Sequence, residues 1–178
     1  MNKSVFLILF ILGIFSLNAQ LLVQNKSETK VDFKIKNFGV YVTGSFSEVD
    51  IVSYFDPSNI DDSYINAIIK ISSINTGNVK RDGHLFKEDF FDVDNFKYIK
   101  LESSKIEKIS ETSYILEAEL TIKNTSKLIS IPLELTENDD SLLIKSNFII
   151  KRKDYDVGRN IWVLGNNVKI KAVYKAKR

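Results

Sequence analysis

The chain has no cysteine, which excludes disulfide bonds, thiolate metal sites and a lipid anchor on a cysteine side chain. It has one histidine, His84, and no Gly-x-Ser-x-Gly, His-Glu-x-x-His or phosphate-binding glycine loop. Basic and acidic residues number 25 and 23, so no overall charge attracts nucleic acid. No repeat, low-complexity tract or linker divides the sequence. These absences predict one domain that is not an enzyme and has no nucleic-acid partner.

The first nineteen residues have the pattern of an export signal. Lys3 is followed by an apolar run over residues 5–17 and by the small residue Ala19. The run is shorter than the stretch of about 20 residues that a spanning helix needs. We expect cleavage after Ala19, which divides the chain into a signal peptide (1–19) and one domain (20–178) in the periplasm or secreted. An uncleaved anchor is the alternative, but the polar residues that follow contain no basic stop-transfer cluster.

Beyond the signal, apolar and polar residues alternate with a period of two, which is typical of β-strands with one buried face. The pattern predicts about eight strands, at 31–36, 40–54, 64–74, 97–106, 112–123, 127–136, 141–153 and 167–176. The parity of the apolar positions changes near Ser47, which predicts a β-bulge there. We expect a short helix only around residues 87–91.

Eight strands with one apolar face each can close into a barrel or stack as two sheets. Closure removes exposed edges, and a barrel of this size has room for side chains or for one small ligand. An outer-membrane barrel is excluded, because Glu117, Glu119 and Lys123 would then face lipid. We therefore predict an all-β fold, an eight-stranded antiparallel barrel with an apolar interior.

Residues 73–91 form a long charged connection between two predicted strands. Connections of this length are uncommon in compact domains and are often lids or binding loops. This one keeps the apolar residues Leu85, Phe86, Phe90 and Phe91. We expect it to pack as a short helical cap on the barrel.

Seven segments carry a family resemblance through their order and spacing. They are VDFKIKNFGV and VTGSFSEV within 31–49, SINT at 73–76, RDGHLFKEDFF at 81–91, YIKLESSKI at 98–106, LTIKNTSK at 120–127 and FIIKRKDY at 148–155. Together they resemble the YceI-like family of secreted, lipocalin-shaped, polyisoprenoid-binding proteins, over residues 28–176. Two positions depart from the family pattern. Asn124 replaces a usual glycine, although asparagine tolerates a left-handed conformation, and Tyr155-Asp156 replaces a usual aromatic-glycine pair.

The resemblance implies a lipocalin-like barrel that holds an isoprenoid lipid, such as a quinone or polyprenyl chain, as its ligand and uses no other cofactor. An apolar interior attracts such a chain because each buried CH₂ contributes about 0.8 kcal/mol. Taken alone, each wall residue is more typical of plain core than of a ligand contact, and an internal cavity would distinguish the two readings. The candidate wall residues are Phe33, Ile35, Phe46, Ile69, Ile71, Phe90, Phe91, Leu101, Leu116, Leu120, Ile131, Leu133, Phe148 and Ile150.

Arg152 shares its parity with Phe148 and Ile150, so we expect it to point inward. A buried guanidinium needs partners, and Asp82 or Asp154 could pair with it and clasp the cap to the barrel. Spare donors would remain for the carbonyl or phosphate oxygens of a ligand.

Arg81 and His84, on the cap, are further candidates for contacts with a polar head group. A cation site at Asp89, Asp92 and Asp94 is the weaker reading of this acidic segment, because such residues more often cap a helix and face water.

Three functional classes remain open. The first, which we favour, is non-enzymatic binding and carriage of an isoprenoid lipid. The second is an envelope-stress or interaction module, which would lack a tunnel and expose an apolar patch around residues 86–96. The third is an enzyme, which would show a perturbed titratable group in a cleft. A partly open mouth would favour a partner that covers it, so a homodimer is also an open alternative.

Overall fold

The computed structural model describes residues 22–138 and 140–177 of the chain. The expected signal peptide (1–19) lies outside the described residues and stays a prediction. None of the helices in the described ranges is long and apolar enough to cross a membrane.

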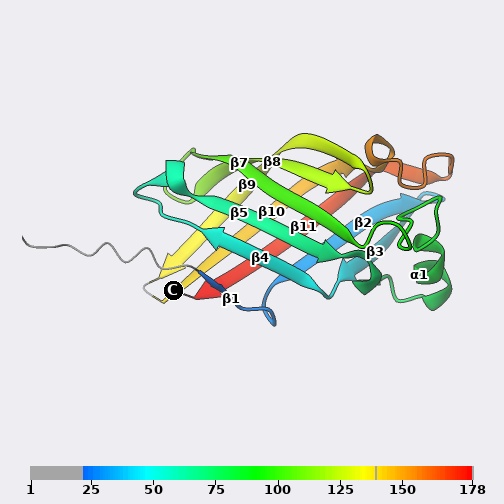
Figure 1. Ribbon diagram of the computed structural model, residues 1–178, viewed down its shortest axis with the longest axis horizontal. Helices are drawn as coiled ribbons and strands as arrows, with labels where there is room; N and C mark the ends of the chain where they lie inside the picture. Colours follow the sequence, from blue (N-terminus) through cyan, green and yellow to red (C-terminus); the bar gives the residue numbers. More distant parts are fainter. Residues whose placement is uncertain (1–21, 139, 178) are drawn as a thin grey trace, which may run out of the picture.

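The fold is one antiparallel sheet that curls on itself, with a short helix at one end (Figure 1). The strands are β1 (Val23–Gln24), β2 (Lys30–Asn37), β3 (Val40–Phe46), β4 (Val49–Tyr54), β5 (Tyr64–Lys70), β6 (Ile74–Asn75), β7 (Tyr98–Lys108), β8 (Ser113–Ile122), β9 (Thr125–Asn138), β10 (Ser141–Lys151) and β11 (Leu164–Lys177). Their order in the sheet is β4-β5-β7-β8-β9-β10-β11-β2-β3-β6, and β1 pairs with the end of β11. The predicted all-β, lipocalin-like antiparallel barrel with a short helical cap is confirmed, although the described residues form eleven strands rather than eight.

The predicted strand 40–54 is two strands, and the predicted bulge near Ser47 is wrong. β3 pairs with β2 and β6, whereas β4 pairs with β5, so the chain changes partners at residues 47–48. The corner is fixed by Ser47 N donating to Ser73 O (3.2 Å) and Lys70 N donating to Glu48 O (3.0 Å). The parity change therefore marks a corner of the sheet. Irregular register occurs instead at Ser103/Lys105 and at Leu164/Val168.

The helix lies earlier than predicted. α1 spans Val79–Leu85, and residues 87–91 form turns. Asn78 caps its first turn by accepting a hydrogen bond from Arg81 N (3.0 Å). Gly83 lies inside the helix, and because glycine disfavours helical structure, the sequence did not indicate a helix at these residues. Two other predicted strands end early, because η2 (Ile71–Ser73) follows β5 and η3 (Arg152–Tyr155) follows β10.

Left-handed residues close two turns where the sequence departs from the family pattern. In the β8–β9 turn Lys123 has φ 56°, so it takes the left-handed position that we expected Asn124 to tolerate. After η3, Asp156 has φ 55°. Aspartate adopts this conformation more readily than most residues, so it can replace the usual glycine.

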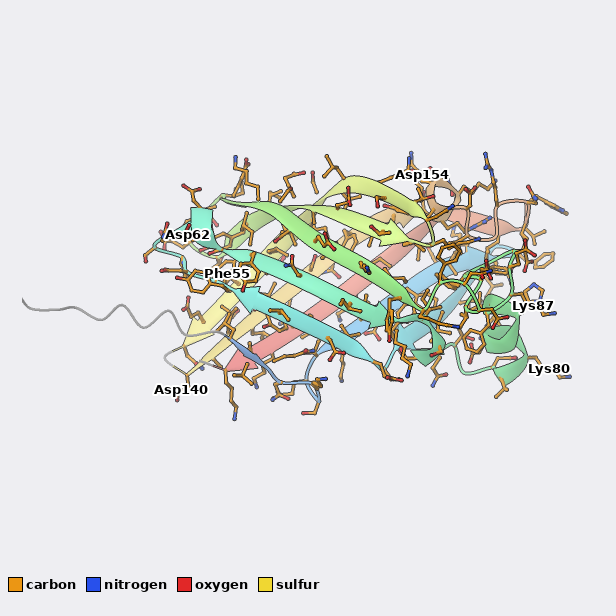
Figure 2. The ribbon with its side chains drawn as sticks, in the orientation of Figure 1. Phe55, Asp62, Lys80, Lys87, Asp140 and Asp154 are labelled. Atoms are coloured by element: carbon orange, nitrogen blue, oxygen red, sulfur yellow. The ribbon has the colours of Figure 1, made fainter. Side chains whose placement is uncertain are left out.

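The two ends of the barrel differ in how they are filled. At one end the side chains of Leu22, Phe55, Tyr114, Leu135 and Leu142 form a solid core. The rings of Phe55 and Tyr114 meet edge to face, with centroids 5.1 Å apart. Figure 2 shows Phe55 near the opposite end of the molecule from Lys80 on α1. The end that carries α1 is where the candidate site lies.

The side chain of Gln24 joins the β1 and β4 edges near the solid end. Its Nε2 donates to Val49 O (2.9 Å) and its Oε1 accepts from Ile51 N (2.9 Å). A side-chain amide thus replaces a backbone ladder between β1 and β4, and an ion pair between Lys26 and Asp50 lies beside it.

Replacing Gln24 by alanine should lower the free energy of unfolding by about 1–3 kcal/mol, because a backbone donor and a backbone acceptor lose their partners. Urea unfolding measures the change. The control is Val23→Ala, whose side chain is exposed on the same strand and should change stability by less than about 0.5 kcal/mol. Equal midpoints for the two variants would contradict a stabilising role for the amide.

Candidate ligand-binding cavity

An apolar cavity of about 510 Å³ occupies the barrel between the solid core and α1. This volume lies within the range of about 300–1,000 Å³ that is usual for small-molecule sites. β2 lines it from Val31 to Asn37, which spans about 20 Å at roughly 3.3 Å per residue. The interior is therefore hollow, long and narrow rather than filled throughout.

Most candidate wall residues line this cavity. They are Phe33, Ile35, Phe46, Ile69, Phe90, Phe91, Leu101, Leu116, Leu120, Ile131, Leu133, Phe148 and Ile150, and Arg81 and Arg152 also reach it. Ile71 does not line it, because η2 interrupts the alternation of β5 and turns this fully buried side chain into the surrounding core. That these residues contact a ligand stays a prediction.

Sequence reasoning left out other members of the wall. Those with inward parity on predicted strands include Val31, Val42, Ala67, Val168, Ile170 and Ala172. Their signal was present in the period-two pattern. Ile161 and Val163 also line the cavity, but they lie in a loop, where no periodicity could place them.

The polar groups deep in the cavity are bonded to the protein. The hydroxyls of Tyr174 and Ser53 lie 2.7 Å apart, and Ser146 Oγ donates to Pro132 O (2.6 Å). The deep part therefore offers an apolar chain a surface whose polar atoms already have partners.

Arg81 and His84 lie where the wall of the cavity meets α1. Arg81 donates from Nε to Thr76 Oγ1 (2.7 Å) and from Nη2 to Thr76 O (2.7 Å). The His84 ring meets Phe90 edge to face, at 5.2 Å between centroids, and its Nε2 lies 3.5 Å from Asp89 Oδ2. These groups are the polar side of an otherwise apolar opening.

Arg152 is 3% exposed, and its partners differ from those predicted. The guanidinium donates to five backbone carbonyls: Nε to Gly165 (2.9 Å), Nη1 to Val157 (2.8 Å) and Gly158, and Nη2 to Ile161 (2.8 Å) and Leu164 (2.7 Å). The predicted ion pair with Asp82 or Asp154 is wrong, and so is the prediction of spare donors. The five carbonyls accept from all five N–H groups of the guanidinium. Asp82 instead accepts hydrogen bonds from Thr76. Burial lowers the pKa of Arg152.

The loop whose carbonyls Arg152 binds, within residues 157–165, contacts the segment after α1 at Gly158. Gly158 N donates to Asp89 O (2.8 Å), and its φ of 57° is left-handed. A Cβ there would lie 2.8 Å from the ring of Phe90. This close approach, rather than an Arg–Asp pair, joins the loop to the cap.

The segment around residues 86–96 does not form the exposed apolar patch expected of an interaction module. Phe90 is buried, and Phe86, Phe91 and Phe96 are half-buried against the core. Within the described residues, no three histidine, aspartate or glutamate side chains gather as a cation site. Asp92 instead accepts hydrogen bonds from Asn95.

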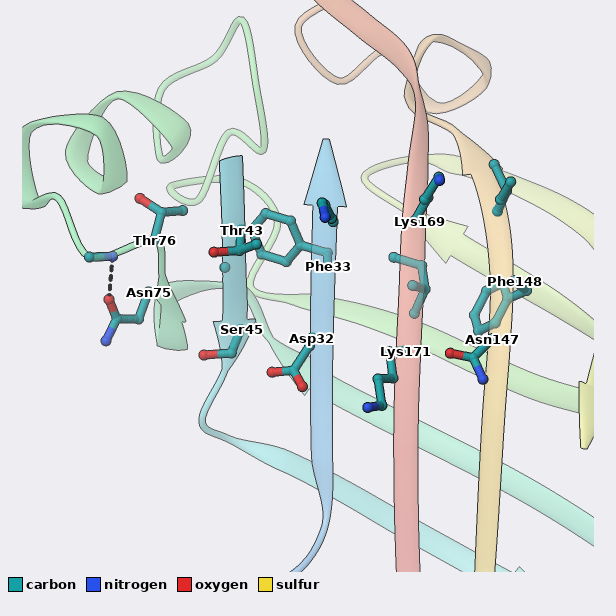
Figure 3. A pocket seen from close by; sticks show the side chains of 15 residues that line it. Asp32, Phe33, Thr43, Ser45, Asn75, Thr76, Asn147, Phe148, Lys169 and Lys171 are labelled. Atoms are coloured by element: carbon teal, nitrogen blue, oxygen red, sulfur yellow. Dashed lines mark hydrogen bonds between the residues drawn. The ribbon is translucent and has the colours of Figure 1, made fainter. Parts of the chain in front are cut away.

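A second, open groove lies on the outer face of β2, β3, β10 and β11 (Figure 3). Asp32, Ser45, Asn147 and Lys171 are among its lining residues. The ring of Phe33 lies behind it against Gly44, where a Cβ would be 2.3 Å from the ring. Gly44 therefore lets Phe33 pack against the backbone of β3.

Comparison with known proteins agrees with this fold. The family model of the YceI-like domain matches residues 23–176. A UPF0312 protein of Yersinia enterocolitica is 25% identical over 79% of this chain and 76% of its own. One of Photorhabdus laumondii is 29% identical over 59% of this chain, a match that spans only 55% of that protein.

Solved structures have the same fold. BcnA of Burkholderia cenocepacia has a TM-score of 0.82 at 22% identity, covering 86% of this chain and 99% of its own. The Campylobacter jejuni YCEI protein has a TM-score of 0.71 at 27% identity, covering 77% and 85%. A polyisoprenoid binding domain from Saccharophagus degradans has a TM-score of 0.71 at 14% identity, covering 89% and 99%.

Replacing Arg152 by lysine should destabilise the protein by about 2–5 kcal/mol. Lysine has three donors for five carbonyls, and each buried acceptor left without a partner costs about 1–3 kcal/mol. Chemical denaturation measures the loss, and amide exchange should rise over residues 156–165. Arg159→Lys is the control, because its ion pair with Asp156 is exposed and surface pairs contribute little. A loss no larger than that of the control would contradict this role.

Stability should fall as the pH rises above about 10. Burial raises the pKa of Tyr155 and of Tyr174, so the folded protein keeps protons that the unfolded chain has lost, and the free energy of unfolding decreases with pH. Tyr155→Phe should flatten this decrease, because it removes one of these titrating hydroxyls. The Tyr155 hydroxyl has no protein partner among the described residues, so its removal breaks no hydrogen bond. Urea midpoints between about pH 8 and 11 test this. Tyr98→Phe, at an exposed site, is the control, and a slope in Tyr155→Phe equal to that of the native protein would refute the assignment.

Proposed function

We propose that this chain, which belongs to the YceI-like domain family, binds and carries a long isoprenoid chain, of the quinone or polyprenyl type, without acting as an enzyme. The observation that supports this most directly is the long apolar cavity inside the barrel. The barrel is open at the α1 end of this cavity and filled by packed side chains at the other end. The fold shared with a protein described as a polyisoprenoid binding domain adds to it.

The chemistry of the cavity favours a hydrocarbon chain over a polar metabolite. Its wall is built mainly from valine, isoleucine, leucine and phenylalanine. Each methylene buried there contributes about 0.8 kcal/mol, and the hydroxyls of Tyr174 and Ser53 deep inside bond to each other. Selection would then depend on chain length and shape.

We place the polar end of the ligand at the opening. There Arg81 donates from Nε and Nη2 to Thr76. Its Nη1 has no protein partner among the described residues, so it can donate to a carbonyl or phosphate oxygen of the ligand. His84 lies on the same helix. With the expected export signal, this describes a carrier of isoprenoid lipid in the periplasm or outside the cell.

Filling the cavity should remove binding without unfolding the protein. Ala67 lines the cavity, and its neighbour Ile68 is 47% exposed. Ala67→Phe places a ring in the path of the ligand, and losing contact with two methylenes already costs about tenfold in affinity. Ile68→Phe adds the same ring outside and should leave affinity unchanged.

Binding of geranylgeraniol, measured as radiolabel retained on gel filtration, and mass spectrometry of lipid that co-purifies without detergent are the two readouts. The native protein should release an isoprenoid on solvent extraction. If the extract is empty and Ala67→Phe binds geranylgeraniol as well as the native protein does, the cavity is not the lipid site.

A further inference from the structure

Four large apolar side chains are exposed on segments that also line the cavity. The exposed fractions are 74% for Phe38, 69% for Val40, 88% for Val79 and 88% for Trp162. They come from the β2–β3 turn, the first residue of β3, the start of α1 and the loop before β11. Phe38 N donates to Val163 O (3.0 Å), which holds two of these segments side by side.

The segments that carry these side chains also contribute to the wall of the cavity. Phe38 itself lines the cavity, as do Val163 and Leu85, the last residue of α1. We call Phe38, Val40, Val79 and Trp162 the rim. The rim residues contribute nothing to the buried core of the described chain, so the fold does not require them to be apolar.

The chemistry of the rim fits a lipid bilayer. Tryptophan prefers the boundary between hydrocarbon and water, and basic side chains can reach lipid phosphates from there. Lys36 and Lys80 are exposed next to the rim in sequence, and Figure 2 shows Lys80 and Lys87 at this end of the molecule. Glu88 and Asp89, also exposed in the cap, offset part of this charge. Insertion of apolar side chains should therefore dominate over attraction to anionic lipid.

The arrangement also favours a bilayer over a protein partner. The rim consists of separate side chains on different segments of the chain, whereas a protein partner usually contacts a contiguous patch. A fluid bilayer can accommodate apolar side chains that insert separately. Contact there would let an insoluble chain move between membrane and cavity without crossing water.

We propose that the rim docks the open end of the barrel on the surface of a lipid bilayer, where the cavity loads or unloads its ligand. This rests on the proposed function, because it gives the carrier its donor or acceptor.

Trp162 is the single tryptophan of the chain, so its fluorescence reports docking directly. Phosphatidylcholine vesicles, with or without a minority of phosphatidylglycerol, should move its emission to shorter wavelength. In the double variant Val40→Ser with Val79→Ser, which keeps Trp162, the vesicle partition coefficient should fall by at least about tenfold. The matched control is Val23→Ser with Ile109→Ser, two sites of similar exposure near the solid end.

Three outcomes would overturn docking: no response of the native protein to either vesicle, undiminished partition of the rim variant, or a loss as large in the control. Concentration-dependent self-association that the rim variant abolishes, without vesicle binding, would make the rim a dimer surface and equally overturn docking.

Binding of geranylgeraniol without vesicles separates this proposal from the carrier function. Neither Val40 nor Val79 lines the cavity, so both double variants should bind it as the native protein does. Binding without docking would refute only the rim proposal. Docking by a native protein that binds no geranylgeraniol would refute the carrier function and with it this role of the rim.

Discussion

The structure depends on one constraint: a single sheet with one apolar face must bury that face, and the chain supplies almost nothing else to cover it. Among the described residues the only α-helix is seven residues long. The sheet therefore has to curl and cover itself. The apolar face becomes an interior, and the filling of that interior decides whether the protein is solid or hollow.

The difference between the two ends follows from local packing. At the end away from α1, aromatic residues such as Phe55 and Tyr114 meet across the barrel and fill it. Toward α1 the inward side chains include small residues, such as Ala67 and Ala172, and the walls stay apart around the cavity. A core without a large void is normally more stable. Keeping this space apolar and open is therefore what the carrier function would require.

Arg152 shows how the cap end keeps its shape without a large core. A buried cation with no carboxylate is costly unless its donors are satisfied, and here a single side chain satisfies the carbonyls of one loop. That loop carries Ile161 and Val163 to the cavity and meets the cap at Gly158. The same loop carries Trp162, so the geometry of the opening and of the rim both depend on this guanidinium.

The period-two pattern alone determined the all-β class, the inward set exemplified by Phe33, Leu116 and Ile131, and the apolar nature of the interior, because burial of alternate residues leaves its mark on every strand. The corner at residues 47–48, the position of α1, the partners of Arg152 and the retreat of Ile71 into the core were decided only by tertiary structure. The corner and the partners of Arg152 depend on backbone groups distant in sequence, such as Ser73 O and Gly165 O, which carry no side-chain signature. A hollow interior likewise depends on how far opposite walls stand apart, and a list of apolar residues reads the same whether they meet in the middle or leave a space.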